Sequence, residues 1–311
     1  MKMIDTNWKL ARKRNALYTR AAMIRAMRGF FIDRDYLEVE TPSRIPGPAP
    51  ECHIDAIPSD GWFLHTSPEL CMKRLLAAGY SRIFQITRCF RGGERGLIHL
   101  PEFTLLEWYK SGIDYSRMME ECEKLIVHVA RSLGHEGKIH YRGNEIDIRS
   151  PWERISVRDA FRRYSSVSLK KALENNCFDE IMVGEIESRL AGTKRPVFLY
   201  DYPVVLGALA RVKKADPDVA ERFELYMGGL EIANAFSELT DAAEQRARFE
   251  EEQKNRRKSG KSSYPMPEKF LSELTNMPES SGIALGVDRL AMIFTDSASI
   301  DDVVTFTPEE L

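Results

Sequence analysis

Two stretches rich in β-branched and aromatic side chains lie close together in the chain: Arg82-Ile83-Phe84-Gln85-Ile86-Thr87-Arg88-Cys89-Phe90 and Phe103-Thr104-Leu105-Leu106-Glu107-Trp108-Tyr109. Such stretches predict strands. The segment 91–101 between them is rich in glycine and charge, which is typical of a loop. The sequence therefore predicts an antiparallel pair of strands joined by a long loop.

Outward from this pair, strands and helices alternate. Apolar residues at three- and four-residue spacing predict helices over 15–31, 118–133, 156–164 and 290–294, and Ser67-Pro68 marks the start of one through Leu76. We expect further strands at 36–42, 141–148, 197–200, 223–227 and 282–285, and a hairpin at 54–64. The segment 165–194 shows the least organisation. With no repeat or linker, the pattern predicts a single α/β (α+β) domain over residues 1–311.

Composition narrows the function classes. The 45 basic residues nearly cancel the 47 acidic ones, so the whole chain has no electrostatic signature of a nucleic-acid binder. The five cysteines form no C-x-x-C pair, which argues against a disulfide framework and a zinc ribbon and favours a reducing, cytoplasmic compartment. Residues 1–14 lack the apolar core of a signal peptide, and no run of 18 apolar residues occurs, so we expect neither secretion nor membrane insertion.

The loop segment Phe90-Arg91-Gly92-Gly93-Glu94 places an arginine beside two glycines. Glycine lets backbone approach a large anion closely, and the planar fork of arginine suits a phosphate. Taken alone, Arg91 fits an exposed hairpin loop equally well, because surface arginines are common.

Three glutamates, Glu224, Glu231 and Glu238, are spaced by sevens. Odd spacing on one strand puts side chains on opposite faces, so a turn or bulge is needed to bring them together. Gathered carboxylates beside a triphosphate are how proteins hold Mg²⁺. The alternative is three separately solvated side chains, which residue type alone favours.

The segment 281–290 runs as a glycine-punctuated strand into a helix with Arg289 in its first turn. A cation there opposes the helix dipole. An anionic ligand explains Arg289 more readily than folding does, and a salt bridge to Asp288 or another acid is the alternative.

In order and spacing, these segments together with 37–42 resemble the three signature motifs of class II aminoacyl-tRNA synthetases, specifically the lysyl subgroup, over nearly the whole chain. The longest matches are Thr66-Ser67-Pro68-Glu69, Pro101-Glu102-Phe103-Thr104-Leu105-Leu106-Glu107-Trp108-Tyr109 and Asn234-Ala235-Phe236-Ser237-Glu238-Leu239-Thr240-Asp241-Ala242. The resemblance implies the class II catalytic fold, a six-stranded antiparallel sheet flanked by helices. It also implies a homodimer formed through the first motif.

The resemblance implies a site for ATP and Mg²⁺. Arg91 and Arg289 would be catalytic, Arg91 on the α-phosphate and the substrate carboxylate, with Phe103 and Arg289 on the two faces of adenine. His99 would lie near the triphosphate, and Glu224 and Glu231 would bind Mg²⁺. The remaining ATP-site residues would be Gly93, Glu94, Ile232 and Gly286.

By the same resemblance, Glu69 would contact the backbone-side amine of a lysine-like amino acid, and Glu238 with Tyr109 would receive its side-chain ammonium. The other residues of the substrate site would be Ser67, Pro68, Asn234, Phe236 and Ala284.

Within this family the chain resembles the elongation factor P–lysine ligases, which act on (R)-β-lysine and lack an anticodon-binding domain. The chain begins almost at the first catalytic-domain helix, so we expect no such domain and no stable tRNA binding. Ala284 stands where lysyl-tRNA synthetases have glycine, and its methyl group can disfavour α-lysine by about 1–3 kcal/mol. The expected acceptor is a lysine of elongation factor P.

Two positions depart from the family pattern. Gly93 replaces the usual glutamate, which falls at Glu94, and Leu100 replaces asparagine, which would leave an apolar rim. Because Arg91, Glu231 and Arg289 are kept, we expect activity. The alternatives are a lysyl-tRNA synthetase-like enzyme acting on α-lysine and tRNA, and a catalytically silent regulatory paralogue. The basic cluster 254–261 is interpreted as a solvated helix end, with a docking surface as the alternative.

Overall fold

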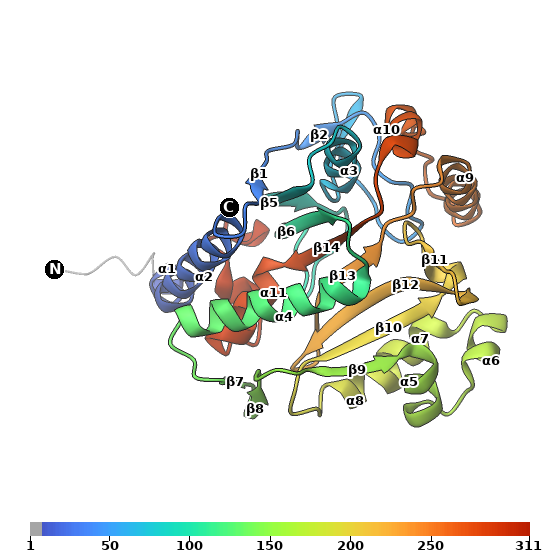
Figure 1. Ribbon diagram of the computed structural model, residues 1–311. Helices are drawn as coiled ribbons and strands as arrows, with labels where there is room; N and C mark the ends of the chain where they lie inside the picture. The colour runs from blue at the N-terminus through green and yellow to red at the C-terminus, as the bar shows by residue number, and fades with distance from the viewer. Residues whose placement is uncertain (1–7) are drawn as a thin grey trace.

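The computed structural model describes residues 8–311; residues 1–7 of the N-terminal segment considered above lie outside the described residues. A nine-stranded sheet forms the centre of the molecule, in the order β1-β5-β6-β14-β13-β12-β10-β9 with β11 paired to β12 (Figure 1). Its strands are β1 (Leu37–Glu38), β5 (Arg82–Phe90), β6 (Glu102–Ser111), β9 (Glu153–Ser156), β10 (Val197–Pro203), β11 (Val212–Lys213), β12 (Asp216–Met227), β13 (Leu230–Ser237) and β14 (Ser280–Gly286).

The six strands from β5 to β10 along this order are antiparallel throughout. The short strands β1 and β9 extend the sheet in parallel at its two edges. The expected six-stranded antiparallel sheet is therefore confirmed, with short additions at its margins.

Three helices cover one face of the sheet: α2 (Arg14–Ile32), α4 (Tyr115–Ser132) and α11 (Val287–Thr295) (Figure 1). The helical spacing of apolar residues in α2 buries Met23, Met27, Phe30 and Phe31 completely. These side chains pack with those of α4 and α11 on Leu106 and Trp108 of β6 to form the main core. Burial on this scale is the principal stabilising term of the domain.

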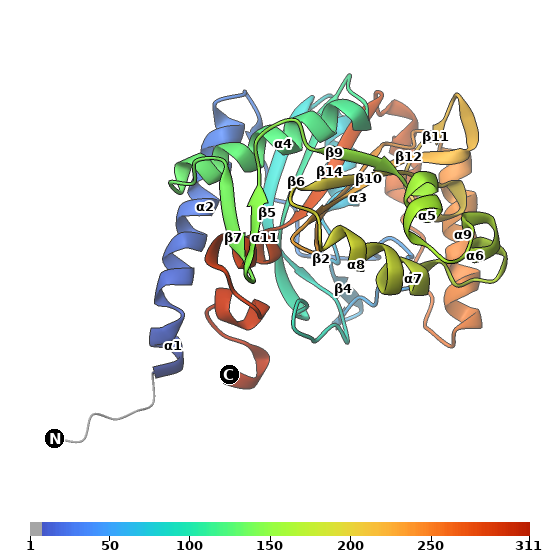
Figure 2. The same ribbon diagram turned by 90° about the horizontal axis from the view of Figure 1, so that it is seen from below.

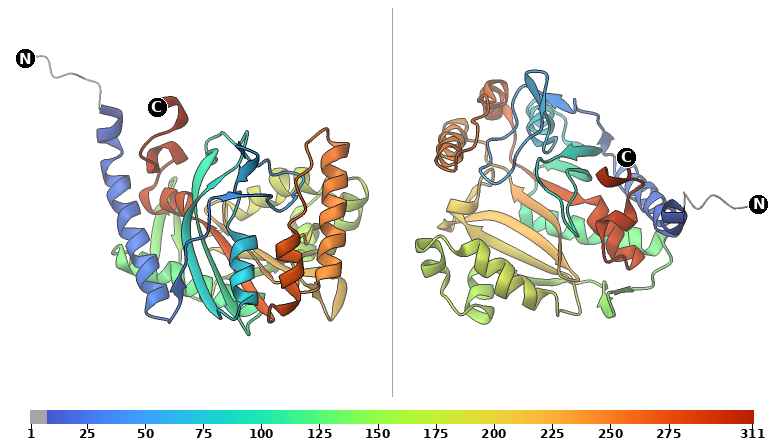
Figure 3. Two further views of the ribbon diagram at one scale, coloured as in Figure 1. Left: turned by 90° about the horizontal axis from the view of Figure 1, so that it is seen from above. Right: turned by 180° about the vertical axis from the view of Figure 1, so that it is seen from behind.

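The opposite face carries α3 (Glu69–Ala77), α9 (Ala242–Lys258) and α10 (Glu268–Glu273), which pack together through a second, smaller core. Figure 3 shows α9 and α10 side by side outside the sheet. At the β10 end of the same face lie α5 (Val157–Tyr164), α6 (Leu169–Glu174), α7 (Phe178–Ile181) and α8 (Glu187–Leu190), as Figure 2 shows from below. The side chains of alternating strand residues that remain on this face are the ones available to a ligand.

The remaining elements are short. They comprise the helix α1 (Trp8–Arg12), the three strands β2 (Arg44–Ile45), β3 (Pro58–Ser59) and β4 (Trp62–Leu64), the hairpin of β7 (Lys138–Tyr141) and β8 (Asn144–Asp147), the π-helix η1 (Met182–Ile186) and the 3-10 helices η2 (Val204–Leu206), η3 (Leu274–Asn276), η4 (Ile300–Val303) and η5 (Pro308–Glu310).

Three predicted elements differ from the structure. The strand expected at 141–148 is a hairpin, because Arg142 and Gly143 adopt positive φ and turn the chain. The strand expected at 36–42 is reduced to the two residues of β1. The poorly organised segment 165–194 contains α6, α7, η1 and α8, whose apolar residues pack on β10.

The two ends of the described chain lie together beside α2, where Lys13 pairs with Glu310 at 2.7 Å. Across residues 8–311, no helix combines the length and the apolar character needed to cross a membrane. The five cysteines are all free.

Candidate active site

The register of the sheet brings the predicted substrate residues into adjacent rows on one face. One row pairs Glu224, Asn234, Ala284 and Glu107 across β12, β13, β14 and β6. The next row pairs Arg222, Phe236, Gly282 and Tyr109. Because directly paired residues point to the same side of a sheet, these side chains share the face that α3 covers.

A bulge adds Glu231 to this face. The β12–β13 register shifts between Leu225 and Tyr226, so that Tyr226 pairs with Glu231 and Ile232 has no partner on β12. The extra residue reverses the alternation, which places Glu231 on the same side as Asn234. The predicted need for a turn or bulge is therefore confirmed.

Lys73 on α3 joins the two carboxylates that were assigned to the substrate amines. Its ammonium lies 2.6 Å from Glu69 Oε1 and 2.5 Å from Glu238 Oε2, and 5.7 Å from the ring centre of Phe236. Burial alone would lower the pKa of Lys73, but Glu238 and Glu69 raise it above its ordinary value. Burial raises the pKa of Glu238 to about 7, although Lys73 opposes the shift. Sequence reasoning missed Lys73, because lysine is normally exposed.

Glu107 is a further buried carboxylate that sequence reasoning missed. It accepts hydrogen bonds from Ser67 Oγ at 2.5 Å and from the Tyr109 hydroxyl at 2.9 Å. Burial raises the pKa of Glu107 to about 8, with Glu69 adding to the shift. The available signal was its position two residues before Tyr109 on one strand, which puts both on the same face. The site thus gathers three carboxylates, Glu69, Glu107 and Glu238, around one lysine.

Small residues on β14 leave room for these groups. A Cβ at Gly282 would overlap both the Tyr109 ring and Glu238 Oε1. Only glycine therefore allows that tyrosine and that carboxylate to close over the strand. Ala284 lies between Asn234 and Glu107 in its row, so its methyl group stands on the substrate face.

Ser67 and Pro68 set the start of α3. The Ser67 hydroxyl accepts a hydrogen bond from the backbone N–H of Glu69 at 3.0 Å, while the same hydroxyl donates to Glu107. Pro68 flanks the first helical residue, Glu69, whose negative charge suits the first turn of a helix. Ser67 and Pro68 therefore fix the position of Glu69 at the start of α3, from which its side chain extends to Lys73.

Arg91 begins the loop between β5 and β6. Its backbone N–H donates to Pro101 O at 2.9 Å, and its guanidinium carbon lies 5.0 Å from the ring centre of Phe103. Glu94 Oε1 is 3.9 Å from Nη1, a loose contact. The Nε atom is buried and has no hydrogen-bond partner among the described residues. At Gly93, φ is +77° and no atom lies within 4 Å of the position that a Cβ would take, so the loop has room beside the arginine. An unpartnered guanidinium donor beside open backbone fits a phosphate.

Arg289 on α11 links two other predicted residues. Its Nη1 donates to Glu231 O at 2.9 Å and to Glu231 Oε2 at 3.1 Å, and its Nη2 lies 2.7 Å from His99 Nε2. Because the guanidinium only donates, His99 accepts through Nε2. Burial lowers the pKa of His99, and Arg289 lowers it further. The alternative of a salt bridge to an acid is therefore realised with Glu231, whereas Asp288 pairs with Arg20 at 2.7 Å.

Glu224 and Glu231 lie close enough to affect each other electrostatically. Burial raises the pKa of Glu224, Arg222 opposes that shift, and Glu231 adds to it. Glu224 already accepts from the Tyr202 and Tyr226 hydroxyls at 2.5 and 2.7 Å and pairs with Arg222 at 2.5 Å. In the described part of the chain, no three His, Cys, Asp or Glu side chains converge as a metal site. An ion beside Glu224 and Glu231 would need further oxygen ligands, such as those of a phosphate.

Four further residues from the sequence analysis have defined positions, and one of them, Leu100, differs from its expected place. Leu100 is buried in the main core rather than at an apolar rim of the site, because its side chain packs with the apolar side chains of that core. Ile232 is also buried in that core, so any contact with a nucleotide would come through its backbone. Glu238 joins Lys73 rather than the other two spaced glutamates. Gly286 directly precedes α11, and a Cβ at Gly286 would lie 3.7 Å from Arg289 Cβ, an ordinary contact distance.

Comparison with known proteins agrees with this geometry. Residues 3–310 match the family model for tRNA synthetases class II (D, K and N). The chain is 37% identical to an elongation factor P–(R)-β-lysine ligase of Pectobacterium atrosepticum, over 98% of each chain, and 36% identical to one of Hamiltonella defensa, over 97% and 98%. It is also 36% identical to a lysine–tRNA ligase of Moorella thermoacetica, over 93% of this chain and 64% of that protein.

Proposed function

Since the chain belongs to the class II tRNA synthetases (D, K and N) and is an ATP-dependent ligase, we propose that it activates (R)-β-lysine as an aminoacyl-adenylate and transfers it to a lysine of elongation factor P. The observation that carries the proposal is the set of three carboxylates around Lys73: the buried Glu107 and Glu238 and the partly exposed Glu69. At a pH above the raised pKa values of Glu107 and Glu238, three acids and one internal cation leave a surplus of negative charge, which a diamino acid with two ammonium groups complements.

The two amines of the substrate have separate partners in this arrangement. We assign Glu69, at the start of α3, to the amine nearer the carboxylate. Glu107 and Glu238, with the Tyr109 hydroxyl, receive the side-chain ammonium. Buried hydrogen-bonding groups of this kind reject analogues that leave them unpaired, so neutral amino acids are excluded.

In the first step a carboxylate oxygen of the amino acid attacks the α-phosphorus of ATP. The new C–O–P linkage forms as the bond to pyrophosphate breaks. Arg91 holds the α-phosphate and the attacking carboxylate together, and Arg289 with His99 lies along the nucleotide. Catalysis here consists of positioning and of neutralising developing charge. Glu231, whose side chain is 38% exposed, and Glu224 would hold Mg²⁺ together with the phosphates, where the ion supplies further charge neutralisation.

In the second step the ε-amine of the acceptor lysine attacks the carbonyl carbon of the adenylate. An amide bond forms, the bond to AMP breaks, and the amine loses a proton. The named relatives that match this chain along almost their whole length are ligases for elongation factor P, which supports that acceptor. Ala284 supports the choice of (R)-β-lysine, because its methyl group lies between Asn234 and Glu107 where the substrate amines would sit.

A lysyl-tRNA ligase activity on α-lysine is the second candidate, favoured by the identity to the lysine–tRNA ligases. Transfer of radiolabel separates the two. The purified protein is incubated with ATP, labelled (R)-β-lysine or α-lysine, and either elongation factor P or tRNA. We expect label on elongation factor P from (R)-β-lysine. An Arg91→Ala variant is the blank, and label on tRNA from α-lysine would overturn the proposal.

A further inference from the structure

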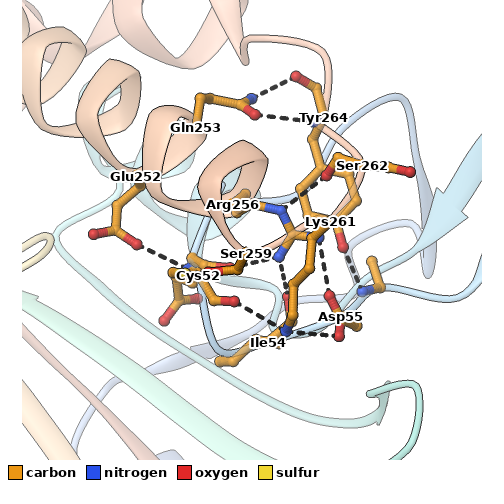
Figure 4. A network of polar contacts seen from close by, with 12 residues as sticks. Cys52, Ile54, Asp55, Glu252, Gln253, Arg256, Ser259, Lys261, Ser262 and Tyr264 are labelled. Carbon is orange, nitrogen blue, oxygen red and sulfur yellow. Dashed lines mark hydrogen bonds and ion pairs between the residues drawn. The ribbon is translucent and has the colours of Figure 1, made fainter.

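The segment 51–56 lacks regular secondary structure yet runs beside the site. The backbone N–H and C=O groups of this segment form few hydrogen bonds with other backbone groups, so side chains must supply their partners. They come from the end of α9 and the segment that follows it. Glu252 accepts from Cys52 N at 2.8 Å, Lys261 Nζ donates to Cys52 O at 3.1 Å, and the Tyr264 hydroxyl accepts from Ala56 N at 2.8 Å (Figure 4).

Arg256 is the centre of this network. It is only 1% exposed, although it belongs to the basic cluster that the sequence suggested to be a solvated helix end. Its Nη1 donates to Glu51 O at 2.8 Å and to Ile54 O at 2.9 Å, and its Nη2 donates to Asp55 Oδ1 at 2.9 Å. Its Nε donates to Ser262 O at 3.0 Å. The forked guanidinium therefore uses its donors to fix three parts of the loop.

Four further contacts stabilise the same assembly. The Arg256 guanidinium lies 4.1 Å from the ring centre of Tyr264, and Lys261 Nζ pairs with Asp55 Oδ2 at 2.9 Å. Gln253 bonds both backbone groups of Tyr264. Arg256 thus contacts Tyr264 on one side and the loop 51–56 on the other (Figure 4).

The loop passes this restraint to the catalytic arginine. The Asp55 carbonyl accepts a hydrogen bond from Gly92 N at 2.6 Å, and Gly92 follows Arg91 directly. A Cβ at Gly92 would lie 3.3 Å from that carbonyl, so the two backbones are close. Arg256 also holds the carbonyl of Glu51. Burial raises the pKa of the Glu51 carboxyl to about 7, while Arg91 lowers it and Glu69 raises it.

We propose that Arg256 is a positioning residue for the adenylation reaction: by holding Glu51, Ile54 and Asp55, it keeps the loop 51–56 against Gly92 and thereby fixes Arg91. The inference rests on the proposed function for its kinetic consequence only. The guanidinium of Arg256 donates to Ser262 and to the loop 51–56. Its effect reaches the reacting atoms through the loop and one backbone hydrogen bond.

The test compares Arg256→Met with the matched control Arg257→Met. Arg257 is exposed, and its side chain donates only to Ser263 Oγ among the described residues. Amide hydrogen exchange and ATP–pyrophosphate exchange per active site are measured. For Arg256→Met we expect amide exchange over 51–57 and at Gly92 to rise at least tenfold, with β13 and β14 unchanged. We expect kcat to fall at least tenfold, while KM for the amino acid changes less than threefold. The control should match the wild type.

If Arg256→Met does not fold, Asp55→Asn weakens the pair from the loop side, and the same changes are expected at smaller size, about threefold.

Unchanged amide exchange in the loop, or unchanged kcat per active site despite a loosened loop, would overturn the positioning role. Absence of pyrophosphate exchange in the wild type would instead refute the proposed function, and the amide exchange data would still decide whether Arg256 restrains the loop.

Discussion

Replacing Lys73 with methionine tests the electrostatic design of the substrate site. The change removes the ammonium that bridges Glu69 and Glu238 and keeps a similar volume at a fully buried position. Removing one partner of a buried ion pair costs about 3–5 kcal/mol, because the remaining charge is left uncompensated. Since Lys73 serves two carboxylates, we expect a loss of about 4–5 kcal/mol in the free energy of unfolding at pH 8.

The loss should shrink as pH falls. Lys73 remains charged at both pH 6 and pH 8, because its pKa is above the ordinary value. The pKa of Glu238 is about 7 even with Lys73 lowering it, and without the lysine it rises further. At pH 6 the carboxyl of the variant is therefore protonated and uncharged, and the loss should be about 2 kcal/mol.

Urea unfolding of the wild type and the variant at the two pH values measures both losses. Lys170→Met is the matched control, since the Lys170 side chain is 85% exposed and lies 3.8 Å from Glu174. Exposed pairs of this kind contribute at most about 1 kcal/mol. Equal losses for Lys73→Met at pH 6 and pH 8, or a loss below about 1 kcal/mol at pH 8, would refute the reasoning.

Three further outcomes follow from the site. Burial raises the pKa of Glu107 to about 8 and that of Glu238 to about 7, so these carboxyls gain charge as pH rises, and KM for the diamino acid should fall by about tenfold from pH 6 to pH 8. Glu107→Gln should raise KM at pH 8 and make KM depend less on pH. A steep pH dependence of KM in that variant would contradict the assignment of Glu107 to the substrate ammonium. Ala284→Gly should raise the ratio of kcat/KM for α-lysine to kcat/KM for (R)-β-lysine by about tenfold or more, as measured by competitive pyrophosphate exchange. An unchanged ratio would show that the Ala284 methyl group does not select the substrate. Arg289→Gln should raise the pKa of His99, because Arg289 lowers it now; an NMR titration of the imidazole would show the shift, and the wild-type value in the variant would disprove the contact.

The spacing of apolar residues, and the glycines and prolines between elements, were enough to predict the helices and strands of the main core. The helix α2 and the strands β5 and β6 bury continuous or regularly spaced apolar side chains, which the sequence displays directly. The segment 165–194 was harder, because its helices are only four to six residues long and depend on packing against β10. Local sequence carries little signal for such short elements.

The site was predicted where a motif names the residue and missed where tertiary register decides it. Arg91, Arg289 and the bulge at Glu231 follow from charge and spacing in one segment. Lys73 meets Glu238 only because α3 packs over the end of β13, a contact between residues far apart in the sequence. Arg256 is buried because its guanidinium donates to the carbonyls of Glu51 and Ile54, which lie some 200 residues earlier in the chain. Residue type alone predicts that both Lys73 and Arg256 lie on the surface.

ATP–pyrophosphate exchange with (R)-β-lysine, with α-lysine and with no amino acid tests the central claim most directly, with Arg91→Ala as the blank. The arrangement of Glu69, Glu107 and Glu238 around Lys73 predicts rapid exchange that depends on a diamino acid and prefers (R)-β-lysine. Preference for α-lysine would contradict the proposed substrate and favour the tRNA ligase activity. Absence of exchange with either amino acid would contradict catalysis itself and identify a silent paralogue.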